Sequence, residues 1–203
     1  MNDNGAIWIG VDPGGKRNFG LAILRSDGSS QTWCVDCAED AIKIIQKKLD
    51  RIPSGIGIDA PLWWSSGKSG DRSVDQWLRQ HYRLSGGEVQ AANSLRGAAL
   101  IQAAMFVQRV REVFPSIPVT ESHPKALLKG LYYNDWAEFS DCFKAGDKPN
   151  TDHERDALIS AVSAREGFEC RWQNDLSLSV ERLTTEQNPK KYWLAPIHYF
   201  WPE

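Results

Sequence analysis

The chain has 203 residues, of which 41% are apolar and 25% charged, so it can bury one core and is neither disordered nor fibrous. It has no apolar stretch long enough to cross a bilayer and no basic-then-apolar start of a signal peptide, so we expect a cytoplasmic protein without a membrane partner. The formal net charge of −2 excludes a global attraction to nucleic acid, which leaves local patches to make any phosphate contact.

The first third of the chain predicts four strands and one helix. Residues 6–12 form a short apolar run that ends at a Pro-Gly-Gly turn, as a buried strand does. Residues 18–25 and 31–36 predict two more strands, joined by a tight hairpin at Asp27-Gly28. Residues 38–52 predict an amphipathic helix, and residues 55–62 another buried strand. The inner face of that helix is expected to hold Ala41, Ile44, Ile45, Leu49 and Ile52.

The rest of the chain predicts three helices and one strand. A helix is expected around residues 74–83, and a longer one from a cap at Asn93 or Ser94 to Phe114. Residues 118–121 predict a strand, and Thr151 to Glu154 fit a capping box that opens a helix ending at Gly167. The inner face of the long helix is expected to hold Ala98, Ile101, Met105, Val110 and Val113.

This order of elements predicts the fold class. Three strands joined by hairpins, followed by alternating helices and strands, indicate an α/β protein with a mixed sheet of about five strands and helices on both faces. We expect one domain over residues 1–170. Residues 171–203, rich in Trp and Pro from Asn174 onward, are expected to form a C-terminal extension packed on the same domain.

Three of the predicted strands end in an acid, namely Asp12, Asp59 and Glu121. If these strands are parallel neighbours, the acids meet at the carboxyl edge of the sheet, where open α/β folds bind their ligands. Unit charges 4 Å apart interact by about 4 kcal/mol at an effective dielectric constant of 20, so such a cluster needs a cation or protonation. Oxygen ligands suit Mg²⁺ or Mn²⁺. The alternative is that Asp12 and Asp59 merely cap loops.

Four stretches carry a resemblance to a known family. They are residues 9–14 (IGVDPG), 57–62 (GIDAPL), 121–124 (ESHP) and 152–158 (DHERDAL). The first is similar to the opening strand of RuvC-like nucleases of the RNase H-like superfamily, and the set resembles the predicted nucleases of domain of unknown function 429. The resemblance implies an RNase H-like fold, metal at Asp12, Asp59 and Asp156, and hydrolysis of a phosphodiester.

The helix that starts near Thr151 offers three candidate ligands. Spacing puts Asp152 and His153 on the same face as Asp156, so periodicity alone does not choose among them. Asp156 lies at the margin of the inner face, and RuvC-like sites place a further ligand three residues earlier, which is His153 here. Asp152 also has a simple explanation, because the helix dipole stabilises acids in the first turn. Glu121 remains a candidate catalytic group, as either a support for a ligand or an additional ligand.

Substrate contacts are expected from aromatic and basic residues between Trp63 and Glu88. Trp63 and Trp64 could stack on bases there, while cations meet phosphates. The candidates for phosphate contact are Lys16, Lys68, Arg72 and Arg79. The alternative is a solvated loop with two buried tryptophans. His123 and His198 are expected to be structural.

The predicted function is therefore a divalent-metal-dependent nuclease, with Mg²⁺ or Mn²⁺ as cofactor and nucleic acid as partner. The alternative is a non-catalytic RNase H-like module that binds nucleic acid or a nucleotide. Two other motifs are weak. Residues 10–16 satisfy the nucleotide-binding loop pattern without its final Ser or Thr, and Cys34 and Cys37 form a lone C-x-x-C without further ligands nearby in sequence. A sugar-kinase-like enzyme would need two such domains.

Overall fold

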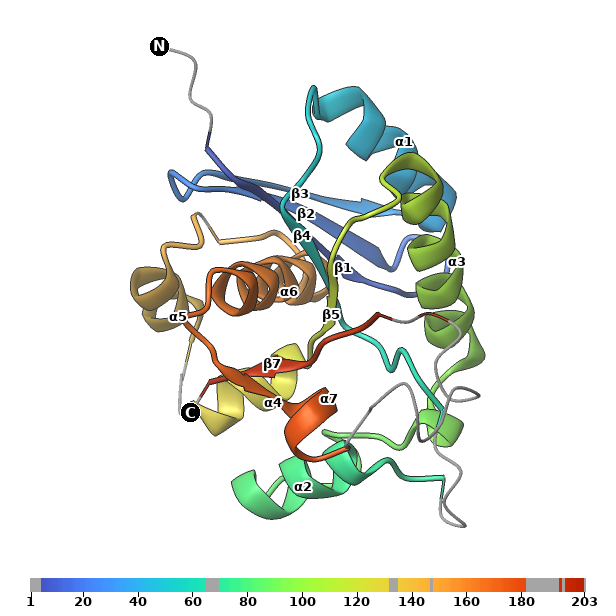
Figure 1. Ribbon diagram of the computed structural model, residues 1–203, viewed down its shortest axis with the longest axis vertical. Helices are drawn as coiled ribbons and strands as arrows, with labels where there is room; N and C mark the ends of the chain where they lie inside the picture. The colour runs from blue at the N-terminus through green and yellow to red at the C-terminus, as the bar shows by residue number, and fades with distance from the viewer. Residues whose placement is uncertain are drawn as a thin grey trace.

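Five strands form the central sheet in the order β3-β2-β1-β4-β5 (Figure 1). β1 (Ile7–Asp12), β2 (Phe19–Arg25) and β3 (Ser30–Val35) are antiparallel neighbours, whereas β4 (Gly55–Ile58) and β5 (Val119–Glu121) run parallel to β1. The computed structural model describes residues 5–64, 70–131, 135–146, 148–181, 194 and 196–202. The predicted α/β class, with a mixed sheet of five strands, is confirmed.

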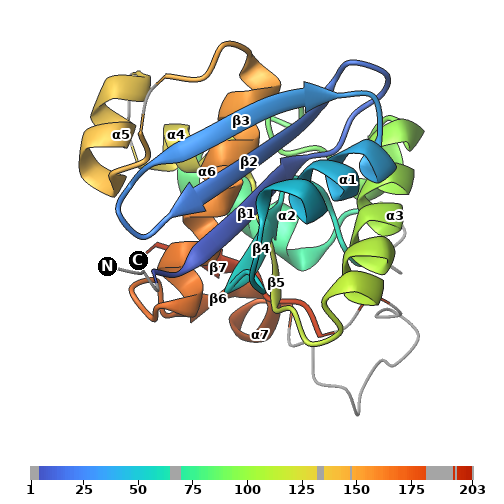
Figure 2. The ribbon, with the colours of Figure 1, turned by 90° about the horizontal axis from the view of Figure 1, so that it is seen from above.

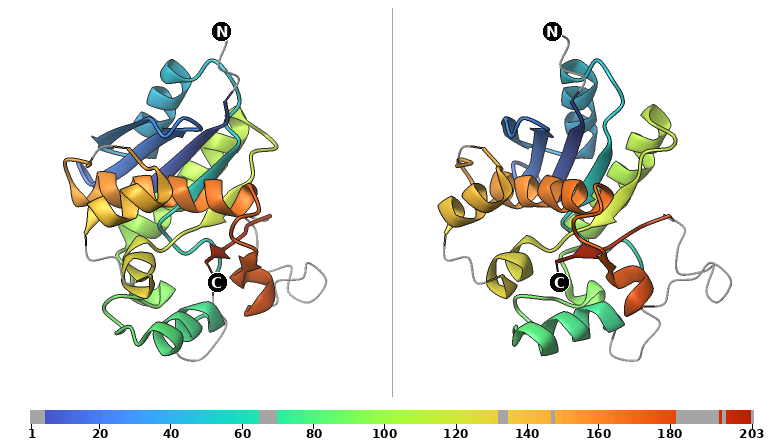
Figure 3. Two further views of the ribbon diagram at one scale, coloured as in Figure 1. Left: turned by 90° about the vertical axis from the view of Figure 1, so that its left-hand side faces the viewer. Right: turned by 60° about the vertical axis from the view of Figure 1, so that its left-hand side comes forward.

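Helices cover both faces of the sheet, as predicted. α1 (Ala38–Lys48) and α3 (Gly97–Val113) lie on one face, and α6 (Asp152–Phe168) lies on the other (Figure 2). Beyond α6 lies a further layer that includes α2 (Ser73–Tyr82), α4 (Pro124–Gly130) and α7 (Leu176–Ser179) (Figure 3). The remaining elements are the 3₁₀ turn Ala92–Ser94, α5 (Trp136–Phe143), β6 (Asn174–Asp175) and β7 (Phe200–Trp201). No helix in the described ranges is long and apolar enough to cross a membrane.

α6 lies directly on the sheet because glycines face it. A Cβ on Gly10 of β1 would lie 1.9 Å from the carbonyl oxygen of Ala157, and one on Gly57 of β4 would lie 1.8 Å from that of Ser160. Gly10 and Gly57 are also register partners, so they form one smooth strip across the two strands. Nearly every residue of α6 from Glu154 to Gly167 is buried, since this helix has the sheet on one side and other elements on the other.

Gly57→Ala is expected to destabilise the protein strongly. The added methyl group would meet backbone atoms of α6, which cannot rotate away, so the cost should reach the upper end of the overpacking range, about 3 kcal/mol. Urea unfolding measures this loss. Gly97→Ala is the matched control, because a Cβ there meets nothing within 4 Å, and it should be neutral or slightly stabilising. Equal stability of the two variants would contradict the close approach of α6.

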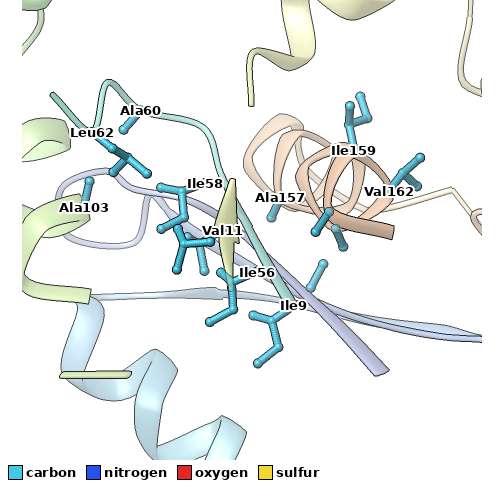
Figure 4. Close-up of a cluster of buried hydrophobic side chains, with 14 of the residues drawn as sticks. Ile9, Val11, Ile56, Ile58, Ala60, Leu62, Ala103, Ala157, Ile159 and Val162 are labelled. Carbon is cyan, nitrogen blue, oxygen red and sulfur yellow. The ribbon is translucent and has the colours of Figure 1, made fainter. Parts of the chain in front are cut away.

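The opposite face of the sheet carries the apolar core. Ile9, Val11, Ile56 and Ile58 alternate with the glycine strip, so they point away from α6, towards the side where Ala103 of α3 lies (Figure 4). All four isoleucine and valine side chains are fully buried. β1 and β4 therefore present apolar side chains to the side of α1 and α3, while Gly10 and Gly57 let α6 approach the backbone on the other side.

Two predicted helix faces are wrong in part. On α3 the buried residues are Ala103, Phe106, Val107 and Val110, whereas Ile101 is 62% exposed and Ala98 and Met105 are exposed too. The helix is apolar over much of its circumference, so periodicity does not identify the side that faces the core. It also begins at Gly97, after the 3₁₀ turn, and not at Asn93 or Ser94. α1 ends at Lys48, which leaves Ile52 outside the helix and exposed.

The C-terminal residues pack beside β5. The backbone nitrogen of His198 donates to Val119 O at 3.0 Å, and Glu121 N donates to His198 O at 2.8 Å. Trp201 is fully buried, and its Nε1 donates to the hydroxyl of Tyr82 at 2.7 Å. The chain from residue 196 to 202 thus contacts both the edge of the sheet and α2.

Candidate metal centre

The strand register places Asp12 and Asp59 side by side. Asp12 is the last residue of β1, and Asp59 follows β4, with its backbone nitrogen donating to Val11 O at 2.9 Å. Because side chains alternate along a strand, Asp12 lies on the same face as Gly10, and Asp59 on the same face as Gly57. Both carboxylates therefore point to the face that α6 covers.

α6 brings the third carboxylate. Its capping box is confirmed: the hydroxyl of Thr151 accepts from Glu154 N at 3.2 Å, and Glu154 Oε2 accepts from Thr151 N at 3.1 Å. This cap fixes the first turns of the helix over the end of β1 and sets Asp156 against the sheet. Carboxylate oxygens of Asp12, Asp59 and Asp156 lie within 4.8 Å of one another. In the part of the chain that the structure describes, this is the one group of three or more such side chains close enough to share an ion.

His153 and Asp152 differ in their relation to this cluster. His153 Nδ1 shares a 2.6 Å hydrogen bond with Asp12 Oδ2, so the residue three positions before Asp156 does reach the site. Asp152 has a side chain that is 82% exposed and pairs with Arg155 at 2.7 Å. Arg155 also holds Oδ1 of Asp156, at 2.7 Å from Nη2. The structure thus brings His153 to the carboxylates and leaves Asp152 outside them.

Glu121 does not join the three aspartates, in contrast to the expectation that strand-end acids meet. It pairs in register with Ile58, so its side chain lies on the opposite face from Asp59. Both of its oxygens are occupied there by Arg72, at 2.6 and 2.8 Å, and Oε2 also accepts from Leu62 N at 3.0 Å. Ser122, one residue later, occupies the row of Asp12 and Asp59 and contacts the hydroxyl of Ser163 on α6.

Burial and mutual repulsion make the three aspartates resist ionisation. Burial raises the pKa of Asp59 well above its ordinary value, and the charges of Asp12 and Asp156 raise it further. Burial also raises the pKa of Asp12, although the hydrogen bond to His153 opposes this, and the pKa of Asp156, although Arg155 opposes it. The hydrogen bond to Asp12 raises the pKa of His153. A divalent cation with oxygen ligands fits this set, because it would compensate the negative charge that the fold concentrates here.

Two of the residues expected to contact phosphate, Arg72 and Arg79, form ion pairs within the protein. The side chain of Arg72 is 2% exposed and is held by Asp75 and Glu121, with its guanidinium 4.4 Å from the ring of Trp63. It is therefore not a surface cation. Arg79 pairs with Asp71 at 2.8 Å and donates to Val89 O at 2.9 Å. Lys16 is exposed in the turn after Asp12, and Lys68 lies outside the described residues.

The sequence analysis does not predict two residues of the site, Lys125 and His123. Lys125 is exposed in the first turn of α4, and its charge acts to lower the pKa of Asp12, Asp59 and Asp156. The Nδ1 atom of His123 lies 4.0 Å from Oδ1 of Asp59. Both follow β5 directly, and Pro124 at the start of α4 is the signal that a helix begins at this edge of the sheet.

His123 should give the protein a measurable pH dependence. Burial lowers the pKa of His123 from 6.5 to about 4, so between these values the unfolded chain binds a proton that the folded protein does not. The contribution of His123 to the free energy of unfolding therefore increases as the pH rises from about 4 to 6.5, by about 3 kcal/mol in total. Urea unfolding in EDTA should show a steeper rise for the wild type than for His123→Gln. Parallel pH profiles for the two proteins would contradict the burial of this imidazole.

The structure gives no support to the two weaker motifs, the loop pattern of residues 10–16 and the pair of Cys34 and Cys37. The turn that contains Lys16 leads into β2, a strand, whereas a nucleotide-binding loop leads into a helix. Cys34 lies in β3, and Cys37 precedes α1 and donates to Asp40 at 3.6 Å. All four cysteines are free thiols.

No family model and no curated protein matches the chain. The resemblance to domain of unknown function 429 therefore has no support from a family model. Among solved structures, RuvC of T. thermophilus in complex with a Holliday junction substrate is similar at 14% sequence identity and a TM-score of 0.39, over 82% of this chain and 95% of that one. At this level of similarity, the RuvC structure assigns neither a residue role nor an activity to this chain.

Proposed function

We propose that the protein is a divalent-metal-dependent nuclease that hydrolyses phosphodiester bonds in nucleic acid, with Asp12, Asp59 and Asp156 as metal ligands. The observation that carries this proposal is the convergence of three carboxylates from β1, β4 and α6 to within 4.8 Å of one another. Clustered, largely buried acids with raised pKa values are typical of functional sites. Oxygen-only ligands favour Mg²⁺ or Mn²⁺.

Each neighbouring side chain has a role in this proposal. When bound, a divalent cation would supply Lewis-acid chemistry at the phosphate and lower the pKa of a water molecule. His153 orients the carboxylate of Asp12 through their hydrogen bond, and Arg155 orients that of Asp156. Lys125 contributes positive charge at the mouth of the site, where a phosphate group approaches. Glu121 acts indirectly, because it fixes the end of β5 through Arg72.

Asp12→Asn tests the proposal. The change is nearly isosteric and removes one ligand charge, so we expect calorimetric titration to show weaker Mn²⁺ binding and oligonucleotide cleavage to be lost. Labelled DNA and RNA strands, incubated with Mn²⁺, Mg²⁺ or EDTA, report the cleavage. Wild-type cleavage by the variant would refute the proposed centre. Metal binding by the wild type without cleavage of any strand would instead support the binding module.

Asp152→Asn is the matched control for metal binding. Asp152 lies on the same helix, but its exposed carboxylate pairs with Arg155 away from the cluster. We expect this variant to bind Mn²⁺ with the affinity of the wild type. A loss as large as that of Asp12→Asn would show that the ligand set on α6 is assigned wrongly.

A further inference from the structure

A cavity of about 170 Å³ lies beside the carboxylate cluster. Its lining includes Asp12 and Asp59, together with Ser122, His123 and Lys125. Residues from the chain between α2 and the start of α3 also form a wall of it, namely Gly87, Glu88, Gln90, Leu95 and Ala99. The cavity is therefore bordered both by two of the proposed metal ligands and by this wall, the segment of residues 87–99.

The wall of this cavity is held in place by specific contacts. Arg79 donates to Val89 O at 2.9 Å and pairs with Asp71, which ties the wall to α2. Glu88 accepts from Ser85 N at 2.6 Å and also pairs with Lys129 of α4. These bonds connect the segment to two helices, so the cavity is formed before any ligand enters.

The lining combines apolar side chains with polar and charged groups, and Arg72, Asp75 and Glu121 are among the charged ones. Pro61, Leu95 and Ala99 contribute apolar surface, and Gln90 contributes an amide that can both donate and accept. The Nδ1 atom of His123 is buried and has no hydrogen-bond partner in the described ranges. A nucleobase has this complementary character, with apolar faces and a polar edge.

The size of the cavity limits what can enter. A cavity of roughly 150 Å³ in another protein accommodates a benzene ring, so this one has the size for a single planar ring system. Arg72 and Arg79 already form ion pairs within the protein, so these two residues are not available to bind a second phosphate backbone. Building on the proposed nuclease activity, we propose that the cavity receives one unpaired nucleobase next to the bond that is cleaved. The substrate is then a single strand, or a duplex with an unpaired nucleotide, since a paired base must first leave its stack.

Binding of small ligands tests this proposal without requiring cleavage. We expect at least one of the four deoxynucleoside monophosphates to bind the wild type in Mn²⁺ about tenfold more tightly than deoxyribose 5-phosphate, a difference of about 1.4 kcal/mol. Ala99→Phe fills the cavity and should remove this preference. Ala98→Phe is the matched control, because Ala98 is exposed and outside the lining, and it should keep the preference. Equal affinity of the wild type for all five ligands overturns the proposal, whether or not Ala99→Phe folds.

Cleavage provides the second measurement. A single-stranded oligonucleotide should be cut with a kcat/KM about tenfold or more above that of the same strand in a full duplex, because the duplex has no free base to place in the cavity. Equal rates on both substrates would overturn the base-binding proposal while leaving the nuclease intact. Absence of cleavage on both substrates, together with a clear preference for the nucleotide, would refute the nuclease and keep the base pocket.

Discussion

Replacing Asp59 by asparagine is expected to reduce metal-dependent cleavage by about a thousandfold. One carboxylate next to a unit of positive charge at 4 Å contributes roughly 4 kcal/mol at an effective dielectric constant of 20, and a loss of that size in the transition state corresponds to about three orders of magnitude in rate. Single-turnover cleavage of a labelled oligonucleotide in Mn²⁺ measures the effect.

The same variant should also change the stability of the metal-free protein and its response to metal. Burial and the charges of Asp12 and Asp156 raise the pKa of Asp59, so its ionised form destabilises the metal-free protein near neutral pH. A folded-state pKa above the unfolded value means that this contribution becomes less favourable as pH rises. Asp59→Asn should therefore melt higher than the wild type in EDTA and gain less from added Mn²⁺. Asp50→Asn is the control, since the side chain of Asp50 is 92% exposed.

Wild-type cleavage by Asp59→Asn would show that the carboxylate cluster is not the reaction centre. A lower melting temperature of this variant in EDTA would show that Asp59 is stabilised by its surroundings and that no cation is needed to compensate it.

The largest loss of stability is expected from Arg72→Met. Arg72 neutralises the two buried carboxylates of Asp75 and Glu121, with contacts of 2.7 and 2.6 Å. Without it both carboxylates remain buried and uncompensated, which costs about 3–5 kcal/mol and corresponds to a fall in Tm of about 6–20 °C for a chain of this size. Thermal unfolding followed by circular dichroism measures the change.

Arg109→Met is the matched control for the loss of an arginine. Arg109 pairs with Glu39 and Glu112 at the surface, where the side chains are nearly half exposed, so its removal should cost under about 1 kcal/mol. The defect of Arg72→Met should grow with pH, because burial already raises the pKa of Glu121 and Arg72 lowers it. Adding Glu121→Gln should recover part of the loss. Similar melting temperatures for the two arginine variants would contradict the buried network.

Local signals in the sequence predict most of the elements. The apolar run before Pro13, the Asp27-Gly28 hairpin and the capping box at Thr151 each act over a few residues, and the structure has a strand, a turn and a helix there. α3 is the counterexample. Its apolar residues surround the helix, so the side that is buried depends on α1 and the sheet, which the local pattern does not contain.

The position of the Glu121 side chain is a feature of the site that the sequence does not predict. Asp12, Asp59 and Glu121 all stand at strand ends, and no sequence pattern distinguishes them. The register does: Ile58 pairs with Glu121, which turns Glu121 to the face opposite Asp59 and towards Arg72. A shift of one residue in β5 would have brought Glu121 to the aspartates, because side chains alternate faces along a strand.

The sequence by itself determined the α/β class, the order of the strands along the chain and the presence of acids at the ends of β1 and β4, because apolar periodicity and turn residues act locally. Only the tertiary structure decided that Asp12, Asp59 and Asp156 converge, that Arg72 is buried, and that His123 and Lys125 border the cavity. These facts depend on strand register and on how closely α6 approaches Gly10 and Gly57, which are contacts between segments far apart in the chain.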